Sequence, residues 1–214
     1  RKPTTGLPAA AREARYRLLA EAARAEEGIS LILTGHTADD QAETVLMRQV
    51  RDDRARDDAR GLAGMAPATL YDWQRWIVRP LLGMRRAALR DVLRRHNIGW
   101  AEDPTNPDEL FERPRIRAAL AGDAGQRRFA KLIARAAQAA AGREAPGQRA
   151  AMLIGDFAGM PAPGLIRLDA AFAASADVQA AVYALRILLA TIGGVSFLPD
   201  EARGQALFGR LRGG

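Results

Sequence analysis

The chain contains no cysteine among its 214 residues, which excludes disulfides, thiolate zinc sites and cysteine nucleophiles within this sequence. Lysine is nearly absent as well, since it occurs only at Lys2 and Lys131. No apolar run reaches the roughly 20 residues of a membrane-spanning helix, because Arg186 interrupts the most apolar segment, 178–192. No signal peptide is visible at the start. We therefore expect a cytoplasmic protein without membrane contact.

What the chain has in abundance is arginine and apolar residues. Hydrophobic residues make up 48% of the sequence, which allows a sizeable core and argues against wholesale disorder. The net charge is +7, which suits a polyanionic partner such as nucleic acid. Arginine also binds phosphate through two parallel hydrogen bonds, which lysine cannot do. A compositional bias explains the choice of arginine equally well, but it does not explain the positive sign of the charge.

Helices and strands alternate in the first half of the chain, which favours an α/β layer structure. Hydrophobic spacing predicts helices at 9–27, 39–50 and 84–95, and strands at 29–34 and 76–78. The second half is predicted to be mainly helical, with a break at 142–147, a short strand at 165–167 and helices at 126–141, 177–192 and 199–211. We therefore expect two domains, with their boundary between Arg117 and Gln126.

The segment from His36 to Thr44, HTADDQAET, gathers polar side chains at the turn from a strand into a helix. Ligands of open α/β sheets bind at such turns. Asp40 and Glu43 are three residues apart and share one face of the helix, where they can hold an ammonium group or a Mg²⁺ ion. Asp39 is predicted to be the helix N-cap. The alternative is that these carboxylates only cap the helix and complement its dipole.

Four local motifs occur in the order that is typical of one enzyme family. They are AREARY at 11–16, the segment 36–44, RPLL at 79–82, and EDPTN at 102–106 leading to Arg113 and Arg117. With these motifs the chain resembles the tRNA(Ile)-lysidine synthetases, which are members of the PP-loop ATP pyrophosphatase superfamily. The phosphate-binding loop of that family, Ser-Gly-Gly-x-Asp-Ser, is not in this sequence, so we expect it upstream of Arg1.

The resemblance implies an α/β fold with a partial doubly wound parallel sheet, adenine nucleotide alpha hydrolase-like, followed by a mainly helical domain. Residues 1–120 would form the C-terminal part of the catalytic domain, and residues 121–214 a tRNA-binding domain. The implied reaction uses ATP and Mg²⁺ to adenylate the wobble cytidine of an isoleucine tRNA, which free lysine then attacks. Two rival functions stay open: another PP-loop tRNA-modifying enzyme, such as a thiolation enzyme, and a non-catalytic tRNA-binding protein. A homodimer is a further expectation.

The resemblance also implies roles for individual residues. The implied catalytic residues are Asp40, Glu43, Arg12 and Arg15. The implied ATP-binding residues are His36, Arg113 and Arg117. For the arginine pair at 12 and 15 the alternative is a solvated helix face, and for His36 it is a structural hydrogen bond to the backbone.

A basic stripe lies beyond the implied catalytic half, on the helix predicted at 126–141. Its members are Arg127, Arg128, Lys131 and Arg135. These side chains can contact a tRNA backbone, which positions the RNA without reading its sequence. The alternative is again a solvated helix face.

Overall fold

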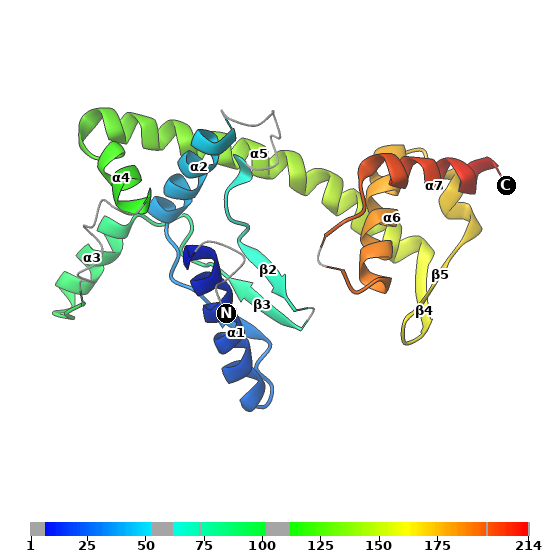
Figure 1. The fold of residues 1–214 in the computed structure, drawn as a ribbon, viewed down its shortest axis with the longest axis horizontal. Helices are drawn as coiled ribbons and strands as arrows, with labels where there is room; N and C mark the ends of the chain where they lie inside the picture. The colour runs from blue at the N-terminus through cyan, green and yellow to red at the C-terminus, as the bar shows by residue number, and fades with distance from the viewer. Residues whose placement is uncertain (1–6, 53–61, 73, 102–111, 196, 214) are drawn as a thin grey trace. The chain divides into compact units, whose positions relative to one another are not determined.

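The computed structural model describes residues 7–52, 62–72, 74–101, 112–195 and 197–213. The loop at 102–111, which contains the EDPTN motif, and the charged segment 53–61 lie outside these residues. The chain forms two compact units, Arg1–Ala139 and Ala140–Gly214 (Figure 1). This division falls later than the boundary expected between Arg117 and Gln126. The reason is that Leu132 and Ala136 pack in a core of the first unit.

The first unit contains a three-stranded sheet. Its strands are β1 (Leu31–Leu33), β2 (Ala68–Tyr71) and β3 (Arg75–Val78), in the order β1-β3-β2. Strand β1 pairs in parallel with β3, whereas β2 pairs with it in antiparallel fashion. The predicted strands at 29–34 and 76–78 are confirmed, while β2 was not predicted. The first unit is therefore α/β, with a mixed sheet.

Helix α1 (Leu7–Ala25) covers one face of this sheet. Tyr16 and Ala23 of the helix pack against Ile32 of β1 and Ile77 of β3. Side chains alternate between the two faces of a strand, so Trp76, beside Ile77, points to the opposite face. There it is 45% exposed.

The remaining helices of the first unit are α2 (Ala38–Asp52), α3 (Arg86–Arg95), α4 (Glu112–Ala119) and the first half of α5 (Gly122–Phe157). A second core joins α2 to α4 and α5, and its buried members are Ala42, Val45, Leu46, Leu120, Leu132 and Ala136. Helix α3 contributes no buried residue. The break expected at 142–147 is wrong, because α5 continues through Pro146. The flanking alanines, which have the highest helix propensity, favour this continuation.

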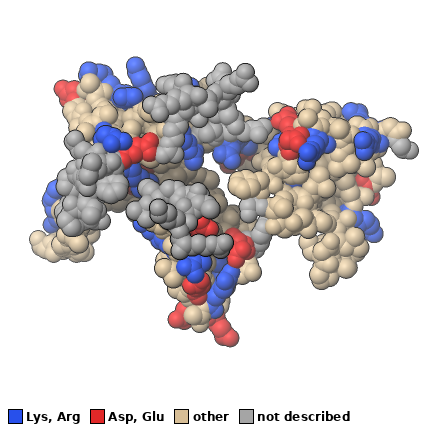
Figure 2. Space-filling view, in the orientation of Figure 1, with Lys and Arg blue, Asp and Glu red and all other residues tan. Residues whose placement is uncertain are grey.

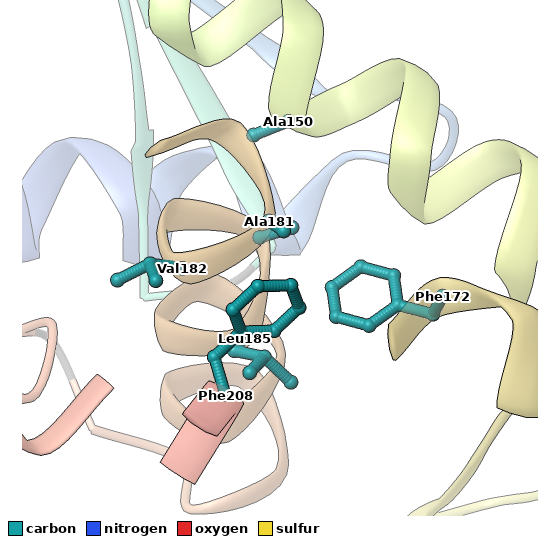
Figure 3. Close-up of a cluster of buried hydrophobic side chains, with 7 residues drawn as sticks. Ala150, Phe172, Ala181, Val182, Leu185 and Phe208 are labelled. Atoms are coloured by element: carbon teal, nitrogen blue, oxygen red, sulfur yellow. The ribbon is translucent and has the colours of Figure 1, made fainter. Parts of the chain in front are cut away.

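The second unit is mainly helical, with one hairpin. It contains β4 (Ala158–Ala162) and β5 (Leu165–Leu168), which pair in antiparallel fashion, then a 3-10 helix (Ala170–Ala174), α6 (Val178–Ile192) and α7 (Glu201–Gly213). Its core surrounds Phe172, whose ring meets the Phe208 ring edge to face (Figure 3). The Phe157 ring also meets Phe172 edge to face. Across the described residues, no helix is both long enough and apolar enough to cross a membrane.

Candidate functional site

The start of α2 is held by Thr37, which is the residue just before the helix. The Thr37 hydroxyl donates to Asp40 Oδ2 at 2.6 Å and accepts the Asp40 N–H at 3.4 Å. The Thr37 N–H donates to the same Oδ2 at 2.9 Å. This reciprocal arrangement is a capping box. The prediction that Asp39 is the N-cap is therefore wrong for α2, because Thr37 takes that position.

Asp39 instead caps a different helix. Its Oδ2 accepts the backbone N–H of Arg86 at 2.7 Å, at the start of α3. Its Oδ1 also lies 3.1 Å from the guanidinium of Arg85. Asp39 thus ties the start of α2 to the start of α3, and it brings the arginines of α3 beside the carboxylates of α2.

Asp40 and Glu43 lie together, as their spacing predicted, and two arginines face them. Arg86 Nη2 is 3.0 Å from Asp40 Oδ1 and 3.5 Å from Glu43 Oε1. Arg117 Nε donates to Glu43 Oε1 at 2.7 Å. The Glu43 side chain is only 2% exposed, and its Oε2 is buried without a hydrogen-bond partner among the described residues. A buried acceptor without a hydrogen-bond partner is costly. A donor that reached Glu43 Oε2 would therefore stabilise the cluster, and we call this oxygen its open acceptor.

Asp40 is ionised at neutral pH. Burial by itself would raise the pKa of the Asp40 carboxyl. The hydrogen bonds from the Thr37 hydroxyl and N–H, together with the charge of Arg86, lower this pKa by more, so the net shift is downward. Asp40 therefore carries a stable negative charge beside the start of α2.

A group of positive charges surrounds His36, which follows β1. Its Nδ1 lies 2.9 Å from the Thr34 hydroxyl oxygen. Burial lowers the pKa of His36, the negative Asp40 raises it, and the nearby charges of Arg79, Arg12 and Arg113 lower it again, with a net downward shift. His36 is therefore neutral at pH 7, while the three guanidiniums near it make the surroundings attractive to an anion.

Arg12 and Arg15, which were predicted together, have different surroundings. Arg12 lies over the ring of Tyr16, 5.0 Å from its centroid, and its charge acts on His36. Arg15 is exposed and forms no hydrogen bond or ion pair with a described residue. Arg117 pairs with Glu43, and Arg113 is exposed on the same helix, α4. The structure therefore brings Arg12, but not Arg15, toward the site.

The basic stripe of Arg127, Arg128, Lys131 and Arg135 is exposed on α5. The buried Leu132 and Ala136 occupy the other face of this helix. Figure 2 shows several Lys and Arg side chains gathered where α5 begins.

Sequence reasoning missed Thr37, Arg79 and Arg86. Arg79 is buried and donates to the Ala66 carbonyl oxygen at 2.8 Å and to the Thr69 hydroxyl at 3.0 Å. A usable signal for Arg86 was present, because cations at a helix N-terminus oppose the helix dipole. Two consecutive arginines at the start of α3 therefore indicate acidic partners elsewhere in the fold.

The carboxylate pair does not fit a Mg²⁺ site. Three of its four oxygens already accept hydrogen bonds from Thr37, Arg86 and Arg117. Within the described ranges, no group of three or more His, Asp or Glu side chains comes together to hold a metal ion. One free acceptor next to two bound guanidiniums suits a compact hydrogen-bond donor better than a divalent ion.

Asp40→Asn should make folding stability less sensitive to acid. Because the folded pKa of Asp40 lies below its ordinary value of 3.8, the ionised group stabilises the fold above that value. This contribution is lost as the pH falls through the folded pKa. The difference in unfolding free energy between wild type and variant, measured by urea denaturation, should shrink from about pH 5 to about pH 2. A difference that stays constant over this range would contradict the assignment.

The whole chain is similar to known proteins. A family model described as a PP-loop domain matches residues 1–123. The tRNA(Ile)-lysidine synthase of Mesorhizobium japonicum is 67% identical over 215 aligned positions, which cover 100% of this chain and 47% of that protein. Those of Brucella ovis and Brucella canis are each 40% identical, covering 99% of this chain and 46% of theirs. The chain thus spans about half the length of the curated relatives it matches.

The PP-loop match runs from α1 through α4, so it includes the carboxylates of α2 and the cationic group around His36. It implies an α/β fold of the adenine nucleotide alpha hydrolase type, and the α/β arrangement of the first unit agrees with this. Because the match covers more than half of the chain, this protein belongs to the family of PP-loop domains.

Proposed function

We propose that the complete protein is an ATP-dependent ligase that joins lysine to the wobble cytidine of isoleucine tRNA. The observation that carries this proposal is the buried Asp40–Glu43 pair, with Glu43 Oε2 left as an open acceptor. The names of the relatives from Mesorhizobium and Brucella point to the same reaction. Thiolation enzymes of this superfamily commonly rely on cysteine, which this chain lacks.

Lysine recognition follows from the charge of the carboxylate pair. An ammonium group is a compact donor of three hydrogen bonds, and Glu43 Oε2 lacks a donor among the described residues. Asp40, which is held ionised by Thr37, adds a second negative charge nearby. We assign Asp40 and Glu43 to the binding of the lysine amine before it becomes the nucleophile.

ATP binding is assigned to the cationic group around His36. Arg12 and Arg113 are exposed side chains whose charges reach His36, and they can neutralise phosphate oxygens. Arg117 would act indirectly, by holding Glu43. Mg²⁺ is bound in many ATP-dependent enzymes largely through substrate phosphates, so the proposal needs no further carboxylate from the described residues.

The proposal extends to the fold of the complete protein. Parallel sheets are normally covered by helices on both faces, whereas Leu31, Leu33 and Trp76 are exposed on the face opposite α1. This uncovered apolar face supports a doubly wound sheet in the complete domain.

Residues 1–120 would belong to the catalytic domain and 121–214 to a tRNA-binding domain. A cytoplasmic location and a homodimer stay predictions.

The direct test is an assay of the full-length protein with ATP, Mg²⁺, labelled lysine and isoleucine tRNA. We expect label to appear in the tRNA only when ATP is present, and mass spectrometry to locate it at the wobble cytidine. Incorporation of sulfur instead would favour the thiolation alternative. Binding of the tRNA without any chemical change would favour the non-catalytic alternative.

The basic stripe of α5 is proposed to contact the tRNA backbone. Replacing both Arg127 and Arg128 by glutamate in the full-length protein should weaken tRNA binding, because phosphates that are no longer neutralised by arginine keep their counterions. The slope of the logarithm of the tRNA association constant against the logarithm of the salt concentration is negative. It should become shallower by about 0.7 to 0.9 for each phosphate that is no longer neutralised. A matched control reverses Arg94 and Arg95, an adjacent and equally exposed pair in the last turn of α3, outside the proposed tRNA-binding domain. Equal salt slopes for the wild type and the α5 variant would reject this interface.

A further inference from the structure

We propose that Arg86 is a positioning residue that orients both carboxylates of the site toward the lysine amine. This inference rests on the proposed function. It differs from the family resemblance, which implied no role for the start of α3. Its basis is that one nitrogen of Arg86, Nη2, reaches both Asp40 Oδ1, at 3.0 Å, and Glu43 Oε1, at 3.5 Å.

The position of Arg86 is fixed from its backbone. Its N–H donates to Asp39 Oδ2 at 2.7 Å, so the first residue of α3 is anchored to α2 one residue before Asp40. The neighbouring Arg85 strengthens this anchor, because its guanidinium also pairs with Asp39 and lies over the ring of Phe129, 3.8 Å from the centroid. The backbone of Arg86 is therefore held in place beside α2, within reach of both carboxylates.

The bridge decides which oxygen remains available. Thr37 occupies Asp40 Oδ2, Arg86 occupies Asp40 Oδ1, and Arg117 shares Glu43 Oε1 with Arg86. Glu43 Oε2 is then the one carboxylate oxygen of the pair without a partner among the described residues. Two carboxylates so close repel each other, and a shared cation between them offsets that repulsion. Without Arg86, we expect Glu43 to turn away from Asp40 and the acceptor to lose its orientation.

The consequence is a specific kinetic pattern. The lysine step depends on the carboxylates, whereas adenylation of the tRNA depends on the cationic group around His36. A positioning role for Arg86 therefore predicts a higher KM for lysine and an unchanged rate of adenylation. A merely structural role predicts that both steps decline together.

The test uses three variants of the full-length protein: Arg86→Gln, Arg86→Lys and, as the matched control, Arg90→Gln one turn further along α3. We expect Arg86→Gln to raise the KM for lysine by about 10- to 100-fold, the range for loss of a charge-assisted hydrogen bond. Pyrophosphate release from ATP and tRNA without lysine should stay within about twofold of wild type. Arg86→Lys, which keeps the charge but has a compact head group, should restore part of the affinity. Arg90→Gln should match the wild type.

Two kinetic outcomes would overturn the inference. One is an unchanged KM for lysine in Arg86→Gln, and the other is an equal loss of lysine transfer and adenylation. A second measurement does not depend on activity: carbon NMR titration should show a higher pKa for the Asp40 carboxyl in Arg86→Gln, because the charge of Arg86 lowers it. An unchanged Asp40 titration would likewise count against the bridge. If wild type itself transfers no lysine, the proposed function fails, while the titration still tests the bridge.

Discussion

Glu43→Gln in the full-length protein should reduce lysine incorporation into tRNA by roughly 100- to 1,000-fold, since breaking a buried charge pair costs about 3 to 4 kcal/mol. The substitution keeps the volume of the side chain but removes the charge that faces the lysine amine. It also leaves Arg86 and Arg117 opposite a neutral amide. The measurement is the initial rate of labelled-lysine transfer at saturating ATP and tRNA.

The matched control for this variant is Glu21→Gln, which neutralises an exposed carboxylate paired with Arg17 on α1. Exposed ion pairs of this kind contribute little to stability, so the control should behave as wild type in transfer and in melting. Glu43→Gln should lower the melting temperature by a few degrees, because it disturbs two ion pairs of a buried group, yet it should remain folded. Transfer at the wild-type rate by Glu43→Gln would remove Glu43 from the site.

Phe172→Ala should destabilise the second unit by about 3 to 5 kcal/mol, the usual cost of emptying a buried phenylalanine site. Phe172 is 0% exposed and packs against Ala150, Leu185 and Phe208 (Figure 3). Its ring meets the Phe208 ring edge to face at a centroid distance of 5.9 Å. Aromatic pairs of this kind stabilise the fold beyond the burial of their apolar surface. Helices α5, α6 and α7 would all line the resulting cavity, so it has little freedom to collapse.

The stability of the Phe172→Ala variant must be measured with a method that detects unfolding of the second unit separately from the first. All three tryptophans precede residue 101, so their fluorescence follows the first unit. Hydrogen exchange of the peptides from α6, followed by mass spectrometry, measures the opening of the second unit directly. Phe197→Ala is the matched control, because Phe197 is 85% exposed and its truncation removes almost no buried surface. Equal protection of α6 in the two variants would show that Phe172 is not central to this core.

Local patterns predicted much of the fold. The helix expected at 39–50 extends over Ala38–Asp52, and the strand expected at 76–78 is β3, because hydrophobic spacing reports directly on which side of an element is buried. The predictions failed where the continuation of a helix or the formation of a strand depended on contacts with other parts of the chain. Gly142 and Pro146 indicated a break that α5 does not contain. Strand β2 has little hydrophobic alternation and forms through its pairing with β3.

The candidate site shows the same division. That Asp40 and Glu43 share a face follows from helix geometry alone, since residues three apart are neighbours on any α-helix. The role of Asp39 was misassigned because two residues, Thr37 and Asp39, each have a side chain able to cap. Only the tertiary structure shows that Thr37 caps α2 while Asp39 reaches across to α3.

The sequence by itself therefore determined the chemistry available at this site: two carboxylates at a helix start, a histidine after a strand, and an excess of arginine. The tertiary structure decided which arginines meet those carboxylates. Arg86 and Arg117 lie 43 and 74 residues from Glu43 along the chain, and no local periodicity relates positions so far apart. Their encounter depends on how α3 and α4 pack beside α2, which is a property of the folded unit rather than of any single segment.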